Sequence, residues 1–275
     1  MDDLGLDIAQ VLTWFPHTQD APYVLVRVND EHSQAWADAL GIPVRRCYIT
    51  DSLLEQRAAN LNVAKAVVLD AKLPDPGSTM AGDFGEIIVY LYQAAREHPR
   101  VAVGPKKWRL KQDRTKPAPH SDVIHFVLPS WPTPSDDDIL LCSEVKTKCT
   151  NGASTPIKSA IEDSTKDSTS RLARTLVWLK ERALAEDLGD ISIAHLERFI
   201  NATDYPPATK QFRAIAVVCA SLLDLELGDA PATPPTHCSV VVISVPDLRG
   251  TYMAVFDAAH RSALLAAPGA LTGGS

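Results

Sequence analysis

The sequence predicts an α/β protein in which helices flank a mixed central β-sheet. A helix is expected over residues 83–96, because Phe84, Ile87, Ile88, Leu91 and Ala95 recur at the spacing of one buried face. Three strand candidates follow this helix closely. Two later runs rich in β-branched residues, 212–220 and 239–245, are typical of buried strands and are separated from the first three by helical segments.

The first part of the chain also predicts both helix and strand. Residues 23–28 form a strand candidate, and residues 31–40 and 51–68 favour helices, the second with Asp51 as its N-cap. A loop with two prolines and a glycine follows at 73–78. We therefore expect an N-terminal α/β segment over residues 1–75, packed on a larger domain over residues 76–275.

The larger domain supplies the remaining elements. Its first three strands are expected at 101–110, 122–128 and 139–146. Thr155 and Pro156 form an N-cap and first-turn pair that opens a helix to residue 163. Further helices are expected at 169–185, 191–200 and 251–265. This order places the strand that ends near residue 146 centrally in the sheet.

Composition excludes several classes of protein. Of the 275 residues, 45% are hydrophobic and 22% charged, which is typical of a globular chain, and the net charge of −7 argues against a broad nucleic-acid-binding surface. The five cysteines form no C-x-x-C pair, which favours reduced thiols. The start of the chain has no signal-peptide pattern, and no apolar stretch approaches the ~20 residues of a membrane span, so we expect a cytoplasmic protein.

The triplet Glu144-Val145-Lys146 carries the main chemical signal. Alternation along a strand puts Glu144 and Lys146 on one face, and the apolar run 139–142 leads into them. Asp122 begins the preceding strand, so the two carboxylates can meet if the strands are antiparallel neighbours. Carboxylates suit Mg²⁺ or Mn²⁺, and a lysine beside them can orient a water or stabilise developing charge. The group predicts phosphodiester hydrolysis.

Glu86 is the fourth candidate of this group. It lies early in the helix predicted over 83–96 and off its apolar stripe, within the run Gly82-Asp83-Phe84-Gly85-Glu86. Gly85 costs about 1 kcal/mol relative to alanine in a helix interior, so it indicates a close approach of the helix to a strand or ligand. We expect Glu86 to reach the metal directly or through water.

Two simpler interpretations apply to these signals. An acid-x-lysine triplet alone most often marks a solvated strand face. Asp136, Asp137 and Asp138 form a second acidic cluster, which we interpret as a solvated turn. The sequence contains no Walker A, G-x-S-x-G or G-x-G-x-x-G motif, so nothing supports a nucleotide hydrolase, an esterase or a dehydrogenase.

The stretch from Arg96 to Lys116 is strongly basic, and it adjoins the predicted site in the chain. Contact with a phosphate backbone is the functional interpretation, and a solvated hairpin is the alternative. The cations predicted to contact DNA are Lys106, Lys107, Arg109, Lys111 and Arg114.

The order Gly85-Glu86, Asp122 and Glu144-Val145-Lys146 resembles the PD-(D/E)xK nuclease pattern, with Ser121 in place of its proline. The helix run 82–86, the strand 121–126 and Leu140-Leu141-Cys142-Ser143-Glu144-Val145-Lys146-Thr147 are similar to the HamA family, the nuclease subunits of the Hachiman antiphage defence system. The resemblance spans most of the chain, and its diagnostic motifs occupy residues 82–148.

The resemblance implies a restriction-endonuclease-like core and a Mg²⁺-dependent deoxyribonuclease. Glu86, Asp122, Glu144 and Lys146 would be catalytic, and the three acids would hold the metal. It also implies a heterodimer with a superfamily 2 helicase, HamB, that degrades DNA when a phage attacks. Two alternatives stay open: a catalytically silent subunit that binds DNA or regulates the helicase, and a stand-alone restriction or repair nuclease.

Overall fold

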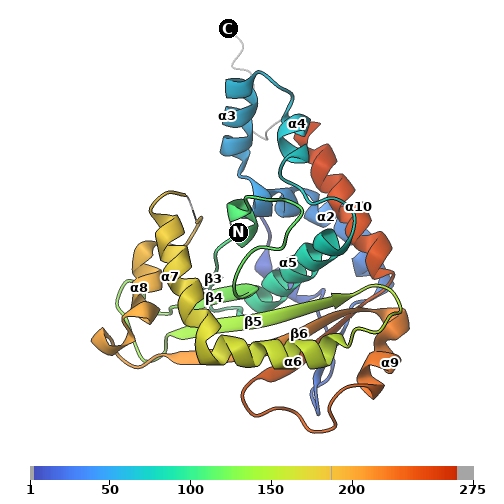
Figure 1. Cartoon of the computed structure of the whole chain (residues 1–275), viewed down its shortest axis with the longest axis vertical. Coiled ribbons are helices and arrows are strands. Elements are labelled where there is room, and N and C mark those ends of the chain that lie inside the picture. Colours follow the sequence, from blue (N-terminus) through green and yellow to red (C-terminus); the bar gives the residue numbers. More distant parts are fainter. Residues whose placement is uncertain (1–2, 187, 265–275) are drawn as a thin grey trace.

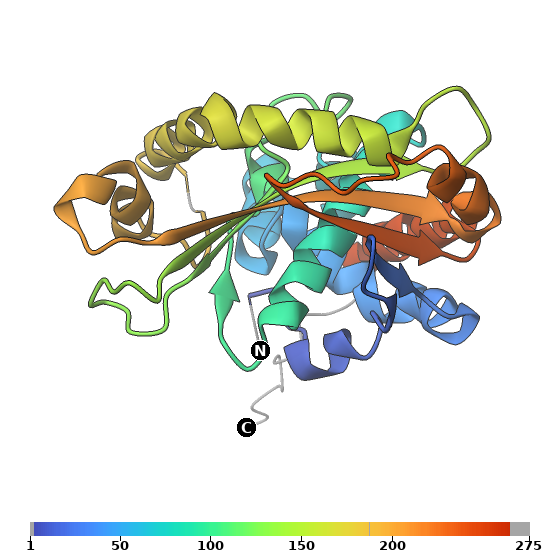
Figure 2. The ribbon, with the colours of Figure 1, turned by 90° about the horizontal axis from the view of Figure 1, so that it is seen from below.

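The computed structural model describes residues 3–186 and 188–264. Within these residues the centre is a seven-stranded mixed sheet, with helices on both faces (Figure 1, Figure 2). Its order is β1-β2-β7-β6-β5-β4-β3. The strands are β1 (His17–Gln19), β2 (Val24–Arg27), β3 (Ala102–Val103), β4 (Val123–Val127), β5 (Ile139–Lys148), β6 (Thr209–Cys219) and β7 (Ser239–Val245).

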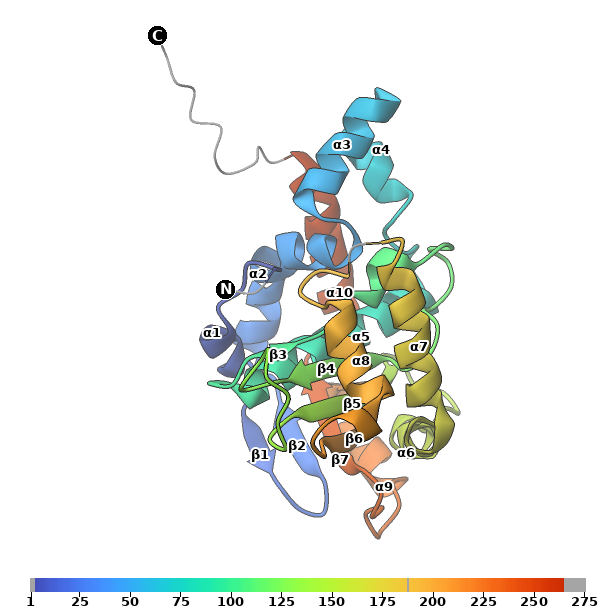
Figure 3. The same cartoon turned by 90° about the vertical axis from the view of Figure 1, so that its left-hand side faces the viewer.

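The helices are α1 (Ile8–Leu12), α2 (Asp30–Tyr48), α3 (Asp51–Leu61), α4 (Lys65–Asp70), α5 (Ser78–Glu97), α6 (Pro156–Lys166), α7 (Leu172–Ala183), α8 (Ile193–Ile200), α9 (Leu223–Gly228) and α10 (Leu248–Arg261). The chain also forms the 3-10 turn η1 (Lys107–Leu110) and the π-helical turn η2 (Asp167–Arg171). Helices α3 and α4 project from the body of the molecule (Figure 1, Figure 3).

The sheet is parallel at its centre and antiparallel at its edges. β5, β6, β7 and β2 pair in parallel, whereas β4 with β5, β3 with β4 and β1 with β2 are antiparallel. The parallel strands are covered on both faces, which explains their nearly continuous apolar sequences. The predicted α/β class with a mixed sheet flanked by helices is therefore confirmed.

The two faces of the sheet bury different residues. On one face Val145, Val217 and Ile243 pack with Phe84 and Ile88 of α5. On the other face Cys142 packs with Leu176 of α7, and the neighbouring strands pack against α6. Figure 2 shows α6 and α7 on one side of the sheet and α5 on the other. Strand β5 therefore lies between α5 and the run from α6 to α7.

Helix α5 extends further than its apolar pattern predicts. It begins at Ser78, five residues earlier than expected, and Asp83 lies inside the helix. Asp83 is buried and accepts hydrogen bonds from the Tyr48 hydroxyl at 2.6 Å and from Lys111 Nζ at 2.7 Å. Gly85 packs against β5: a Cβ atom there would lie 2.0 Å from Thr147 Oγ1. The close approach predicted from Gly85 is confirmed.

Other predicted elements differ from the structure in their extent. The bounds of β7 match, and the helix predicted over 191–200 begins at Ile193. The N-cap of α3 is Thr50, whose hydroxyl accepts from Leu53 N, so Asp51 as N-cap was wrong. The helices predicted at 156–163 and 169–185 are one helical run, α6-η2-α7. The closing helix begins at Leu248, and residue 265 lies outside the described residues.

The strand predicted over 101–110 is wrong for most of its length. β3 comprises only Ala102 and Val103, and residues 107–110 form η1. Pro105 cannot donate a ladder hydrogen bond, and the backbone of Gly104 packs closely against the carbonyl of Ile124. Asp138, predicted to lie in a solvated turn, is buried and paired with Arg198 at 2.6 Å.

The first 75 residues contribute directly to the sheet. β2 pairs with β7 from Val24↔Val241 to Arg27↔Ser244, and α2 packs with α10 in the core that also contains Phe84. The division into parts at residues 1–75 and 76–275 stays a prediction. None of the helices in the described residues is long and apolar enough to span a membrane.

Candidate active site

The candidate site lies where β4 and β5 separate. The two strands pair from Val127↔Ile139 to Val123↔Ser143, and β5 then continues to Lys148. Asp122 immediately precedes β4. Its carboxylate accepts a hydrogen bond from Val145 N at 2.8 Å and so satisfies an amide beyond the last β4–β5 pair. The antiparallel arrangement thus brings Asp122 next to Glu144, as the sequence predicts.

Glu144 and Lys146 lie together on the face of β5 that carries α6 and α7. Lys146 Nζ donates to Glu144 Oε1 at 2.7 Å. The Glu144 side chain is only 2% exposed, whereas that of Lys146 is 30% exposed. The alternative of a solvated strand face is therefore wrong for Glu144, because its carboxylate is buried in a polar cluster rather than hydrated.

Two further residues complete this cluster, and sequence reasoning missed both. Arg171, in η2, donates from Nη2 to Glu144 Oε2. Asp163, in α6, accepts from Lys146 Nζ at 2.6 Å. Each oxygen of Glu144 therefore contacts a cation. Asp163, Asp167 and Arg171 recur at four-residue intervals, a polar stripe on a helical run that could have indicated contact with the sheet.

Glu86 reaches the same region from α5, on the opposite face of β5. Its side chain is buried, and Oε2 has no hydrogen-bond partner. The charges of Lys107 and Asp122 act on Glu86. Lys107 Nζ donates to the carbonyl of Ser121, the residue before Asp122. The separation of β4 and β5 thus lets a carboxylate from each side of the sheet approach Asp122.

Burial raises the pKa values of all three acids. Burial, together with the Asp122 charge, raises the pKa of Glu144 to about 8 against the opposing effects of Lys146 and Arg171. Burial also raises the pKa of Asp122, opposed by Lys107 and by the Val145 hydrogen bond. Burial raises the pKa of Glu86 well above its ordinary range, with Lys107 opposing and Asp122 adding to the shift. The acids therefore destabilise one another's charged forms.

Lys146 and Arg171 respond in the opposite sense. Burial alone would lower both pKa values, but the hydrogen bonds of Lys146 to Asp163 and Glu144 hold its pKa above the ordinary value. The bond of Arg171 to Asp167 and the charge of Glu144 do the same for the pKa of Arg171. Both side chains are therefore cationic over the physiological range of pH, and they offset the acids.

The acids have the donor chemistry of a divalent-metal site, but their side chains do not form a closed ligand shell. Among the described residues no three His, Cys, Asp or Glu side chains come together closely enough to hold a metal ion. Asp122 raises the pKa of both glutamates, and Glu86 Oε2 is unpartnered, so an added cation would relieve repulsion and satisfy a buried oxygen. The residue types thus fit Mg²⁺ or Mn²⁺.

The basic stretch is mostly internal. Lys106 pairs with Asp3, and Arg109 Nη2 donates to Asp3 Oδ2 at 3.0 Å. Lys111 pairs with Asp83, and both side chains are at most 3% exposed. Only Arg114 of the five predicted DNA contacts is substantially exposed, and it pairs with Asp75. DNA contact by this stretch stays a prediction, and these ion pairs give it no support.

The structure defines an α/β protein whose mixed sheet, flanked by helices, is consistent with a nuclease-like core. The sequence model of the HamA family matches residues 9–255 of the 275. The chain belongs to the HamA family and is thus a protein of the Hachiman antiphage defence system. None of the curated proteins matches it.

Proposed function

We propose that this protein is a metal-dependent DNA endonuclease and the effector subunit of a helicase–nuclease antiphage complex. The observation that carries the proposal is the grouping of Asp122, Glu144 and Lys146 where β4 and β5 separate, with Glu86 beside them. Family membership supports the defence role. A lysine bonded to a buried glutamate, with a second acid one strand away, is the equipment expected for phosphodiester hydrolysis.

The proposed roles follow from the contacts. Asp122, Glu144 and Glu86 would hold Mg²⁺ or Mn²⁺. When bound, such an ion activates water for attack and offsets charge on the phosphate. Lys146, kept cationic by Glu144 and Asp163, would stabilise the negative charge that develops on the phosphate oxygens. Val145 N–H orients the Asp122 carboxylate, so the acid is positioned by the strand itself.

The proposed partner is a superfamily 2 helicase of the HamB type, in a heterodimer. The net charge of −7 and the internal pairing of the basic stretch support this part of the proposal. Non-specific affinity for DNA comes from exposed cations at phosphates. A chain that uses most of these cations internally would need a second subunit to bring the DNA to the site.

The test is DNA cleavage by the purified complex with Mg²⁺. We expect Glu144→Ala and Lys146→Ala each to reduce cleavage at least ~100-fold, because the first removes a proposed metal ligand and the second removes the cation that stabilises charge on the phosphate. Lys158→Ala is the matched control: Lys158 is an exposed lysine of α6 outside the site, and its variant should cleave as the wild type does. Equal cleavage by all four proteins would refute the nuclease assignment.

One observation favours a second candidate function, a catalytically silent subunit that regulates the helicase. Both oxygens of Glu144 contact cations of the chain itself, as in a structural cluster. In that case complex formation and antiphage defence would survive Glu144→Ala. Efficient, sequence-specific cleavage by this chain alone would instead favour a stand-alone nuclease.

A further inference from the structure

Arg171 occupies a position that the proposed metal chemistry does not explain. Its guanidinium contacts Glu144 Oε2, donates from Nε to Asp167 Oδ1 at 2.7 Å, and donates from Nη2 to the carbonyl of Asp163 at 2.9 Å. The side chain is 23% exposed, so it closes the cluster on its solvent side. Two other acceptors thus hold this arginine against the glutamate of the E-x-K triplet.

Simultaneous contact of a guanidinium and a divalent ion with Glu144 Oε2 is electrostatically unfavourable. Lys146 already contacts Oε1, so Oε2 is the oxygen left for a metal. An ion bound there would lie within a few ångströms of the Arg171 charge, and repulsion between cations at such distances is strong in a partly buried site. Arginine binding and metal binding at Glu144 are therefore competitive.

We infer that Arg171 controls metal binding: it holds Glu144 in a state without metal, and it leaves Oε2 when the ion binds. This inference rests on the proposed function, because replacement of Arg171 by a metal ion at Oε2 matters only if the enzyme depends on a metal. Arg171 acts through Glu144 and is thus a positioning residue. Withdrawal of one side chain of η2 is then a regulatory step that precedes catalysis.

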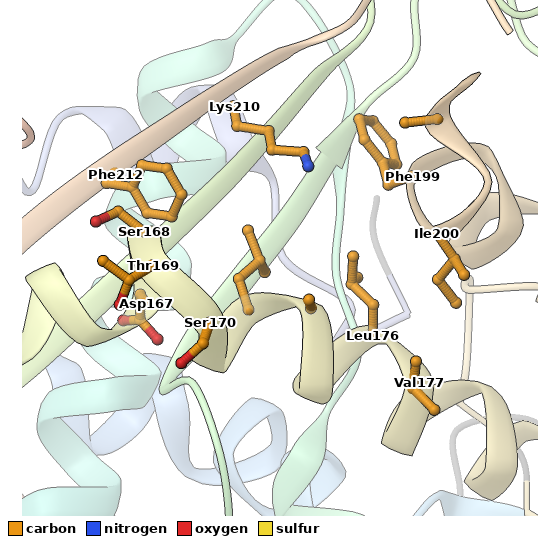
Figure 4. Close-up of a pocket in the computed structure, with 13 residues that line it drawn as sticks. Asp167, Ser168, Thr169, Ser170, Leu176, Val177, Phe199, Ile200, Lys210 and Phe212 are labelled. Carbon is orange, nitrogen blue, oxygen red and sulfur yellow. The ribbon is translucent and has the colours of Figure 1, made fainter.

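The turn η2 that carries Arg171 borders open space on its outer side. A hollow of about 450 Å³ lies on the outer side of the turn, between α7, α8 and the start of β6. Ser168, Thr169 and Ser170 of η2 line it together with Phe212 and Lys210 (Figure 4). The outer side of the turn is therefore not packed against another element there, while Arg171 itself points to Glu144, and π-helical turns occur frequently at functional sites.

Asp167 would lose its ion pair with Arg171 on withdrawal, but other contacts of the cluster remain. Asp167 Oδ1 accepts a hydrogen bond from the Ser121 hydroxyl at 2.7 Å, so this buried acid keeps a partner when Arg171 leaves. Lys146 keeps both of its acidic partners. Loss of the arginine contact thus exposes Glu144 to a new cation without dismantling the cluster around it.

The test measures Mn²⁺ affinity of the full chain by electron paramagnetic resonance, without DNA. We expect Arg171→Ala to bind Mn²⁺ on the order of tenfold more tightly than the wild type, since a charge-assisted hydrogen bond no longer competes. Arg171→Gln keeps a donor for Asp167 but lacks the charge, and it should also bind more tightly. Arg171→Lys keeps a cation and should remain close to the wild type.

Arg174→Ala is the matched control. Arg174 lies three residues further along the same helical run and donates to Ser170 Oγ at 2.8 Å, and both arginines lower the pKa of His120 after the larger effect of its burial. Its removal subtracts the same charge from the same region without touching Glu144. We expect its Mn²⁺ affinity to stay within about twofold of the wild type.

The outcomes separate this inference from the proposed function. If Glu144→Gln abolishes Mn²⁺ binding but Arg171→Ala and Arg171→Gln bind no more tightly than the wild type, the control by Arg171 is refuted and the metal site stands. An equal gain in Arg174→Ala refutes it also, because general charge then explains the effect. If no variant shows binding that depends on Glu144, both the inference and the metal-dependent function fail.

Discussion

Glu144 is held between opposing electrostatic effects. Burial and Asp122 favour its neutral form, whereas Lys146 and Arg171 favour its carboxylate, and the balance leaves a pKa of about 8. A carboxyl group with such a pKa changes its charge just above neutral pH. Protonation and metal binding are linked here, because a metal ligand must lose its proton first.

The pKa of Glu144 predicts how stability depends on pH. The pKa of this carboxyl group is ordinarily 4.5 and is about 8 in the folded protein. Between these two pH values the group is neutral in the folded protein and ionised in the unfolded one. The folded state binds more protons in this window, so the free energy of unfolding falls as pH rises. Glu144→Gln should remove this contribution, whose total change across the window is at most about 5 kcal/mol.

Urea unfolding of the wild type and Glu144→Gln at pH 5, 7 and 9 measures this slope. Asp122 and Glu86 contribute in the same direction in both proteins, so the difference between the two curves reports on Glu144 together with its electrostatic effect on Asp122. Parallel curves across the whole range would contradict the raised pKa of this residue.

At the scale of elements, the contact between α5 and β5 determines the distance between Glu86 and the E-x-K strand. Gly85 lies directly before Glu86 and allows the helix backbone to approach Thr147. The same helix contains Gly82, where an added Cβ atom would meet no atom within 4 Å. The two glycines therefore test close packing and helix propensity separately.

We expect Gly85→Ala to lower the free energy of unfolding by about 1–3 kcal/mol, because the new methyl group overlaps Thr147 Oγ1. Gly82→Ala should instead raise it by up to about 1 kcal/mol through helix propensity alone. Combining Gly85→Ala with Thr147→Ala should recover part of the loss, since the overlapping hydroxyl is removed. Urea unfolding of the four proteins measures these effects, and equal changes at Gly82 and Gly85 would contradict the close contact.

Sequence patterns predicted the elements whose burial is periodic and missed those that depend on tertiary contacts. The apolar run of β7 fixed both of its ends, and Asp122, Glu144 and Lys146 came together because antiparallel pairing and alternation follow from local sequence. The internal pairing of the basic stretch could not be predicted, because Lys106 and Lys111 pair with Asp3 and Asp83, which lie far away in the sequence.

Arg171 shows the same limit within the candidate site. It follows Glu144 by 27 residues, and it reaches the carboxylate only because α6-η2-α7 forms one run across the sheet. The sequence predicted separate helices that end at residue 163 and begin at residue 169, and the structure joins them through η2. No short motif could therefore have included this residue.

At the scale of the whole molecule, one sheet joins the first 75 residues to the rest. β2 supplies the strand that pairs with β7, and α2 packs on α10. Without β2, the backbone of β7 would be an unpaired edge of the sheet. Removing the first segment would therefore open the core itself.

We predict that the folded protein loses β2 and β7 in one cooperative transition. Pulsed hydrogen exchange at increasing urea, read by mass spectrometry on peptides covering residues 24–27 and 241–244, should give a single midpoint for both strands, because the two strands share one ladder inside the same sheet. Two separate midpoints would support the division at residue 75 into independently folding parts.

The bond between Asp122 and Val145 N bears on the choice of an inactive variant. Asp122→Ala removes a proposed metal ligand and also leaves a strand amide without its acceptor, so lost activity could arise from a displaced Glu144. Asp122→Asn retains an oxygen for the amide and changes only the charge. Trapping the complex on uncut DNA is thus best attempted with the asparagine variant, in which the edge of β5 keeps its shape.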